Sequence, residues 1–253
     1  MMKMMIQARK RFSQNFLHDQ GIIKQIIDAV DAASRTHVVE IGPGRGALTL
    51  TLLQQAQVFS AIEIDRDLIE LLKPHFQNSA TLIESDVLKF DFAHLTPTPL
   101  TVIGNLPYNI STPILFHLLK FKKIIDSMFF MLQKEVVLRM AASPGSKEYG
   151  RLSVMVQYVC EVDPLFLVPP SAFEPAPQVE SMVVRLKPYK KSPYGEIADF
   201  TKFANIVQHA FGQRRKTLRN ALKALDVIIP EALTSKRAGE LSVDDFVNLA
   251  NAN

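Results

Sequence analysis

Apolar runs and helical patterns alternate along residues 37–141 of the chain. Five runs are rich in apolar and β-branched residues, namely His37–Ile41, Val58–Ile64, Ala80–Glu84, Leu100–Gly104 and Ser127–Leu132. Helical spacing characterises the segments that separate or follow these runs, namely Ala47–Gln54, Asp67–Gln77, Thr112–Leu119 and Lys134–Ala141. Such alternation is typical of a parallel sheet covered by helices. The pattern therefore predicts an α/β fold.

Two more β-rich runs, Val154–Val168 and Met182–Leu186, predict late strands of the same sheet. The four prolines within residues 169–181 predict a rigid loop without regular structure between these strands. Ser111 predicts a helix start, because a hydroxyl cap at this position would precede a proline in the first turn.

The pattern becomes purely helical after residue 195. Large apolar residues recur at spacings of three and four, namely Phe200, Phe203, Val207 and Phe211. Three basic residues would share one face of the following helix, namely Arg215, Arg219 and Lys223. We therefore expect a sheet domain over residues 1–192 and a small all-α domain over residues 193–253.

Composition is that of a globular protein. The chain has 253 residues, 47% of them hydrophobic, which suffices for a full core. No apolar run approaches the roughly 18 residues of a membrane span, and residues 1–11 lack an apolar signal core. We therefore expect a cytoplasmic protein without membrane contact, and we expect a monomer. The lone Cys160 and six histidines without close spacing predict no intramolecular disulfide and no metal site.

The net charge of +4 is unevenly distributed along the chain. Residues 187–237 hold eleven lysines and arginines against four acids, and residues 1–24 hold five against one. The two ends are therefore basic and the middle is acidic. This pattern predicts a polyanion such as nucleic acid as the partner. Solvated helix faces would give the same pattern, and the chemistry of the middle segment favours the first interpretation.

The first predicted strand runs into Glu40-Ile41-Gly42-Pro43-Gly44-Arg45-Gly46 and then into a predicted helix. Glycine backbones at such a turn let a ligand approach the carboxyl end of the strand closely. The spacing differs from the G-x-G-x-x-G pattern that binds a pyrophosphate. A ligand without phosphate is favoured, and a tight turn without a ligand is the alternative.

Acidic residues follow the next two predicted strands. Glu63 lies about 20 residues after the glycine loop, where a carboxylate can accept hydrogen bonds from both hydroxyls of a ribose. Asp86 could accept a hydrogen bond from the amino group of an adenine. The loop and these two acids together predict an S-adenosylmethionine pocket, on the Rossmann-like sheet of a class I S-adenosylmethionine-dependent methyltransferase.

The fourth predicted strand brings Asn105-Leu106-Pro107-Tyr108 to the same edge of the sheet. An exocyclic amine conjugated to a purine ring is a poor nucleophile. If the Asn105 side-chain oxygen and the Leu106 carbonyl accept its two N–H groups, its lone pair turns toward the methyl donor. Methylation produces an acidic ammonium, so positioning and electrostatics would suffice without a general base. A simple turn is the alternative interpretation.

Two aromatic side chains could hold the target base. Tyr108 can stack on one face, and such stacking contributes about 1–3 kcal/mol per base. Phe173, in the proline-rich loop, could cover the other face. A slot of this kind suits a base that has left its helix or loop stack. The alternative role for Phe173 is a core anchor beneath the loop.

Taken together, these residues resemble the ribosomal RNA small subunit methyltransferase A family, the KsgA branch of the rRNA adenine N6,N6-dimethyltransferases. The resemblance covers nearly the whole chain. It is carried by Phe12–Leu17, Glu40–Gly46, Glu63, Asp86, Asn105–Tyr108, Phe173–Ser181 and Phe211–Asn220. The last of these segments distinguishes this branch from the methylases that confer macrolide resistance by modifying large-subunit RNA.

The resemblance implies dimethylation of N6 in two adjacent adenines of a hairpin loop near the 3′ end of 16S rRNA, within the immature 30S subunit. S-adenosylmethionine would be the methyl donor. Six residues are expected to line its pocket, namely Asn15, Leu17, Gly42, Glu63, Asp86 and Asn105. The reaction centre would consist of Asn105, Leu106, Pro107, Tyr108 and Phe173. Four basic residues are expected to hold RNA phosphates, namely Arg214, Arg215, Lys216 and Arg219.

Two other functions fit the same residues. A 23S rRNA adenine N6-methylase or a DNA amino-methylase would share the chemistry of the tetrapeptide, and the basic C-terminal segment argues against both. An assembly factor that binds immature subunits and methylates only secondarily is the other alternative. A variant of Asn105 that still binds these subunits would separate binding from methylation.

Overall fold

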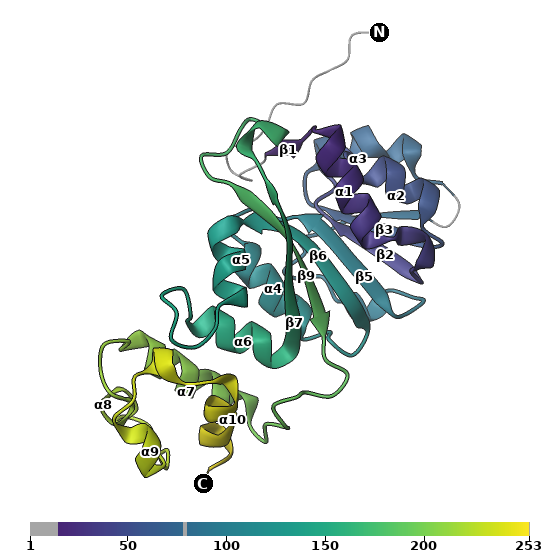
Figure 1. Cartoon of the computed structure of the whole chain (residues 1–253). Helices are drawn as coiled ribbons and strands as arrows, with labels where there is room; N and C mark the ends of the chain where they lie inside the picture. Colours follow the sequence, from purple (N-terminus) through teal and green to yellow (C-terminus); the bar gives the residue numbers. More distant parts are fainter. Residues whose placement is uncertain (1–14, 78–79, 253) are drawn as a thin grey trace. The chain divides into compact units, whose positions relative to one another are not determined.

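The computed structural model describes residues 15–77 and 80–252 of the chain (Figure 1). Their packing divides them into two compact units. The first unit comprises residues 15–134 and 163–188, and the second comprises residues 135–162 and 189–252. The sequence-based division into domains after residue 192 stays a prediction. The packing gives different units, because it groups residues 135–162 with the C-terminal helices.

The first unit is built on a seven-stranded sheet in the order β4-β3-β2-β5-β6-β9-β7. The strands are β2 (His37–Ile41), β3 (Phe59–Glu63), β4 (Ala80–Glu84), β5 (Leu100–Asn105), β6 (Ile125–Gln133), β7 (Cys160–Val168) and β9 (Ser181–Pro188). The five strands β2 to β6 are mutually parallel, and β9 runs antiparallel to β6. This α/β architecture confirms the predicted fold class, and all five strands predicted within residues 37–132 are present.

Helices lie in most of the connections between the parallel strands, because parallel neighbours need a crossover between them. They are α2 (Thr49–Gln55) after β2, α3 (Arg66–Leu72) after β3 and α4 (Ser111–Leu119) after β5. The helix α1 (Gln20–Val30) precedes the sheet, and the Asp19 side chain caps it by accepting the N–H groups of Gly21 and Ile22.

The core of the first unit lies between α1 and one face of the sheet. Five residues of α1 are buried there, namely Ile22, Ile23, Ile26, Ile27 and Val30. They pack with alternate residues of the strands, such as Phe59 and Ala61 of β3 or Phe129 and Met131 of β6. The alternation places one side of every strand in this core, which fixes the register of the sheet.

A second, two-stranded sheet joins the start of the described chain to the proline-rich loop. Strand β1 (Phe16–Leu17) pairs antiparallel with β8 (Phe173–Glu174). The expectation that residues 169–181 lack regular structure is therefore wrong over this short stretch, because the Phe173–Glu174 backbone finds its hydrogen-bond partners in β1.

The second unit is helical over most of its length. Its helices are α5 (Lys134–Ala141), α6 (Arg151–Val159), α7 (Phe200–Gly212), α8 (Leu218–Ala221), α9 (Glu231–Thr234) and α10 (Val243–Asn251). The apolar spacing predicted over residues 200–211 forms α7, which buries Phe203 and Val207.

Three sequence predictions are wrong in detail. Residues 154–159 form the end of α6 and not a strand. The Ser111 hydroxyl does not cap α4, because it donates instead to the Tyr108 carbonyl and Ile110 is the cap residue. Arg215 and Lys223 lie outside α8, which is only four residues long, so no basic helical face spans residues 215–223.

Candidate active site

A cavity of about 370 Å³ opens at the carboxyl ends of β2, β3 and β5, within the first unit. The strand order reverses between β2 and β5, and open α/β sheets bind ligands at such a switch point. Six of the residues that line it were predicted from the sequence to hold a cofactor, namely Asn15, Leu17, Gly42, Glu63, Asp86 and Asn105. The volume is that of a small-molecule site.

The glycine loop follows β2 directly and lines this cavity with residues 42–45. Gly42 and Gly44 both adopt left-handed backbone conformations, with φ of +67° and +58°, which a residue with a side chain would adopt only under strain. The Gly42 N–H donates to the Ile62 carbonyl, and the Gly44 N–H points at the Glu63 carboxylate, 3.4 Å away. The loop is therefore tied to the end of β3.

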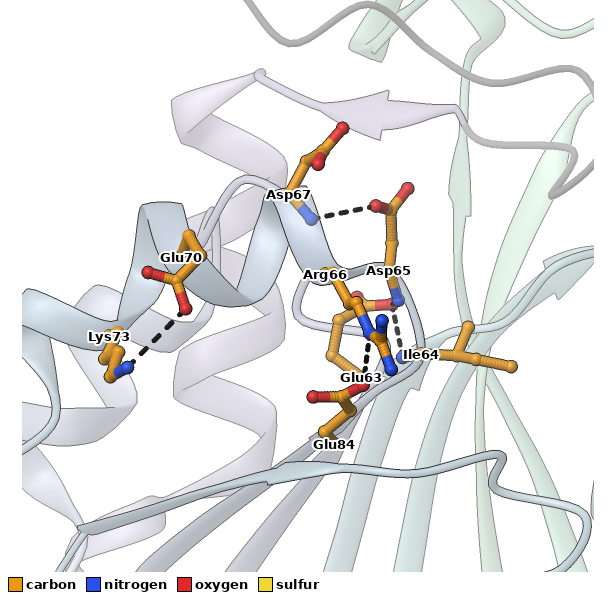
Figure 2. A network of polar contacts seen from close by, with 8 residues as sticks. All are labelled: Glu63, Ile64, Asp65, Arg66, Asp67, Glu70, Lys73 and Glu84. Atoms are coloured by element: carbon orange, nitrogen blue, oxygen red, sulfur yellow. Dashed lines mark hydrogen bonds and ion pairs between the residues drawn. The ribbon is translucent and has the colours of Figure 1, made fainter.

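Glu63 is held in place by the backbone that follows it (Figure 2). Its Oε1 accepts the N–H groups of Ile64 at 2.8 Å and Asp65 at 2.9 Å. Burial raises the pKa of the Glu63 carboxyl, and these backbone hydrogen bonds offset part of the rise. The side chain is thus oriented at the cavity wall before any ligand arrives.

Two acids at the end of β4 have different surroundings. Asp86 lines the cavity and accepts the Leu88 N–H at 3.0 Å. Glu84 lies apart from the cavity lining and forms an ion pair with Arg66 at 2.7 Å (Figure 2). The position predicted to contact an adenine is therefore the one that lines the cavity.

Glu40 is another carboxyl group of the cavity lining, buried near the end of β2. The Thr49 hydroxyl donates to its Oε2 at 2.7 Å. Burial raises the pKa of Glu40 to about 8, and the nearby Glu63 raises it further while the Thr49 hydrogen bond lowers it. Glu40 is thus held neutral over most of the physiological pH range.

The predicted tetrapeptide begins with Asn105, the last residue of β5, and all four of its residues line the cavity. The Asn105 Nδ2 donates to the Asn15 carbonyl at 2.9 Å. The Tyr108 hydroxyl lies 2.6 Å from the Ser181 hydroxyl. Burial raises the pKa of Tyr108, so its phenol is neutral. Both polar side chains of the tetrapeptide are therefore anchored by residues distant in the sequence.

Phe173 does not form an open wall of the cavity. Its side chain is only 3% exposed and belongs to the core cluster with Leu17 and Ala172, so the alternative of a core anchor describes its position in this structure. Its backbone pairs with Leu17 in the β1–β8 sheet. Contact with a base is a prediction that would require this side chain to move.

The residues Phe12–Gln14, which also carry the family resemblance, lie outside the described residues.

Several lining residues were not predicted from the sequence. Phe16 and Arg45 line the cavity, and Ile64 and Val87 add apolar side chains to its lining next to Glu63 and Asp86 in the sequence. Ile64 is 49% exposed, which is unusual for a large apolar residue beside a buried strand. Its position directly after Glu63 at a strand end was the signal that could have revealed it.

The four basic residues predicted to contact RNA all have exposed side chains in the second unit. Arg214 donates to the Lys147 carbonyl at 2.7 Å, and Arg219 lies 3.8 Å from Glu231. Arg214 and Arg215 line a hollow of about 510 Å³ with Arg237, which was not among the predicted RNA contacts. Three arginines and the acid Glu240 therefore line this hollow.

Residues 15–77 and 80–252 contain no group of three or more histidine, cysteine or acidic side chains that could hold a metal ion. Over the same ranges, no helix has the length and apolar character to cross a membrane.

A sequence profile described as "Ribosomal RNA adenine dimethylase" matches residues 5–252. The chain belongs to this family. A "Ribosomal RNA small subunit methyltransferase A" of Saccharophagus degradans is 54% identical over 96% of this chain and 94% of its own length. A protein of the same name from Pseudomonas aeruginosa is 50% identical over 96% and 94%. The family predicted from the sequence motifs is therefore confirmed.

Solved structures agree with the family assignment. A dimethyladenosine transferase from Plasmodium falciparum has a TM-score of 0.79 and 29% identity, over 92% of this chain and 95% of its own. The 23S rRNA methyltransferase ErmE shares the fold, with a TM-score of 0.70 and 23% identity over 93% and 98% of the two chains. The sheet is thus that of a class I methyltransferase, as predicted.

Proposed function

We propose that this protein dimethylates N6 of two adjacent adenines in a hairpin loop near the 3′ end of 16S rRNA. The observation that carries the proposal is the convergence of Asn105 and Tyr108 with Glu63, Asp86 and the glycine loop on one cavity. The higher identity to small-subunit methyltransferases than to ErmE disfavours 23S rRNA as the substrate.

We infer that S-adenosylmethionine occupies the cavity. Glu63 offers carboxylate oxygens for ribose hydroxyls, Asp86 offers an acceptor for the adenine amino group, and Ile64 and Val87 offer apolar surface for the adenine ring. Gly42 leaves room beside the strand end, since nothing lies within 4 Å of where its Cβ would stand. When bound, this molecule supplies an electrophilic methyl group on a sulfonium.

The residues of this chain would act mainly by positioning. Asn105 Oδ1 and the Leu106 carbonyl accept N–H groups of the adenine amine, and Tyr108 stacks on the ring. The bound donor would supply its methyl carbon to N6, with a C–N bond formed, the C–S bond broken and the electron pair left on sulfur, and N6 would then release a proton to solvent. A second round on the monomethylated N6 completes the modification.

We also propose that the enzyme acts in the cytoplasm, as a monomer, on RNA within the immature 30S particle. The exposed arginines of the second unit support phosphate contact, which contributes affinity without sequence information. A single-stranded loop would supply the specificity, because its bases are accessible.

Replacing Asn105 tests the proposal most simply. Asn105→Ala should lower methyl transfer to unmethylated small subunits about a hundredfold or more, because it removes an acceptor from the reaction centre. Asn248→Ala is the matched control, because this asparagine is exposed and does not line the cavity, and it should stay within about threefold of wild type. Near-normal turnover of Asn105→Ala would refute the assigned role. Retained binding of Asn105→Ala to small subunits would confirm that binding and catalysis are separate.

A further inference from the structure

Arg45, in the glycine loop, makes two contacts with the small β1–β8 sheet of the same unit. Its guanidinium carbon lies 4.2 Å from the centroid of the Phe16 ring, which is close enough for a cation–π interaction. Its Nη1 lies 3.4 Å from Oε2 of Glu174. Because Phe16 and Glu174 are paired across this sheet, Arg45 contacts both strands at the same level.

Phe16 in turn lies directly on the glycine loop. A Cβ added to Gly44 would stand 3.3 Å from the Phe16 ring, so the ring packs against the loop backbone on one side. The guanidinium of Arg45 covers the same ring, which is only 8% exposed. The glycine loop therefore holds the segment Asn15–Leu17 in place through its contacts with Phe16. All three residues of this segment line the cavity.

The fastened segment ends at the residue that orients Asn105. The Asn15 carbonyl accepts the Nδ2 of Asn105 at 2.9 Å. A side-chain amide is planar, with its donor and acceptor on opposite branches. Fixing Nδ2 against Asn15 therefore fixes the direction of Oδ1, and it disfavours the flipped amide that would present a donor to the substrate amine.

We propose that Arg45 is a positioning residue for methyl transfer. By holding Asn15–Leu17 on the glycine loop, it keeps the Asn15 carbonyl where it sets the amide orientation of Asn105. The proposal rests on the proposed function of Asn105 as acceptor of the substrate amine. The same arrangement also couples the methyl-donor cavity to the acceptor site, because the segment Asn15–Leu17 that lines this cavity also orients the Asn105 side chain.

The contacts of Arg45 with Phe16 and with Glu174 should contribute unequally. The Glu174 side chain is 61% exposed, and exposed ion pairs contribute little. The stacked guanidinium is planar and weakly hydrated, and a lysine ammonium does not replace it at a stacked site. The methyl-transfer rate should therefore fall in the order Glu174→Gln, Arg45→Lys, Arg45→Ala, with the first variant close to wild type.

Arg35 provides a matched control for Arg45. Its guanidinium lies 5.9 Å from the Phe129 ring centroid and 3.1 Å from Asp126. Its side chain is 25% exposed and that of Arg45 is 29% exposed. Arg35 does not line the cavity and precedes β2, at the opposite edge of the sheet. Replacing it removes a similar arrangement without touching the proposed coupling.

The test combines single-turnover methyl transfer to unmethylated small subunits with an NMR measurement on the side-chain amide of Asn105. In Arg45→Ala the rate should fall about tenfold or more while the half-saturating subunit concentration stays unchanged. The Asn105 Nδ2 resonances of asparagine-labelled protein should move toward those of an exposed amide, and Arg45→Lys should lie between. In Arg35→Lys and Arg35→Ala both readouts should match wild type.

Three outcomes would overturn the proposal. They are an unmoved Asn105 amide in both Arg45 variants, a rate loss in Arg35→Lys equal to that in Arg45→Lys, or a change confined to subunit affinity. The amide measurement needs no substrate, so it is independent of the proposed function. If wild-type protein failed to methylate small subunits, the function would be refuted whatever the amide shows.

Discussion

The protonation of Glu40 depends strongly on the fold. In the unfolded chain its carboxyl has the ordinary pKa of 4.5, and burial raises the pKa to about 8 in the folded protein. The folded state therefore binds an extra proton between these values. The contribution of this proton to the free energy of unfolding is complete below pH 4.5 and is lost as the pH rises toward 8.

Glu40→Gln should remove this loss. Glutamine resembles the protonated acid and can still accept the Thr49 hydroxyl, so the ligand-free variant should gain stability relative to wild type as the pH rises from 5 to 8. The gain should be less than about 5 kcal/mol. Thermal melting at several pH values measures it, with the exposed Glu84→Gln as control. Parallel melting curves at every pH would contradict the assigned protonation.

At the scale of elements, the close approach of β5 to β2 places the tetrapeptide. A Cβ on Gly104 would stand 2.6 Å from the Ile41 carbonyl, so only glycine fits at this crossing. Gly104→Ala should destabilise the fold by about 1–3 kcal/mol and lower methyl transfer, because the strand that carries Asn105 must shift. Urea unfolding measures the first effect. Gly212→Ala, which meets open space, should be neutral or stabilising. Equal stability of the two variants would refute this explanation.

Much of the sheet could be predicted because its strands are separated by helices with a different period. Residues 154–159 could not, because every residue of this run except Gln157 is buried and a fully buried run has no amphipathic period. The expected helix over 215–223 failed for another reason. The Leu218 N–H donates to the Lys236 carbonyl at 2.7 Å, and Thr217 bridges to Arg237, so a distant segment captures this backbone.

The cavity was predictable where the ligand chemistry demands particular residue types at strand ends, as for Glu63 and Asp86. Arg45 and Phe16 were not recognised as partners, because their contact depends on the pairing of β1 with β8, which lie more than 150 residues apart. Phe173 was assigned to the base site because aromatic residues suit stacking. Burial in the core of the first unit decides its position instead.

At the scale of the whole molecule, the basic segment should govern affinity for RNA. Arg215→Ala combined with Arg219→Ala should weaken small-subunit binding. The slope of the logarithm of the binding constant against the logarithm of the salt concentration should fall by the equivalent of about one to two phosphate contacts. The control pair Arg66→Ala and Lys73→Ala removes two exposed bases from the first unit. Binding measured from low to moderate salt gives the slope, and an unchanged slope would assign RNA binding to other surfaces.

The central claim is the identity of the methylated base. Tritiated S-adenosylmethionine offered in parallel with unmethylated small subunits, large subunits and DNA, followed by mapping of the label, tests it directly. We expect four methyl groups on two adjacent adenines near the 3′ end of 16S rRNA. Label confined to large subunits or to DNA would contradict it.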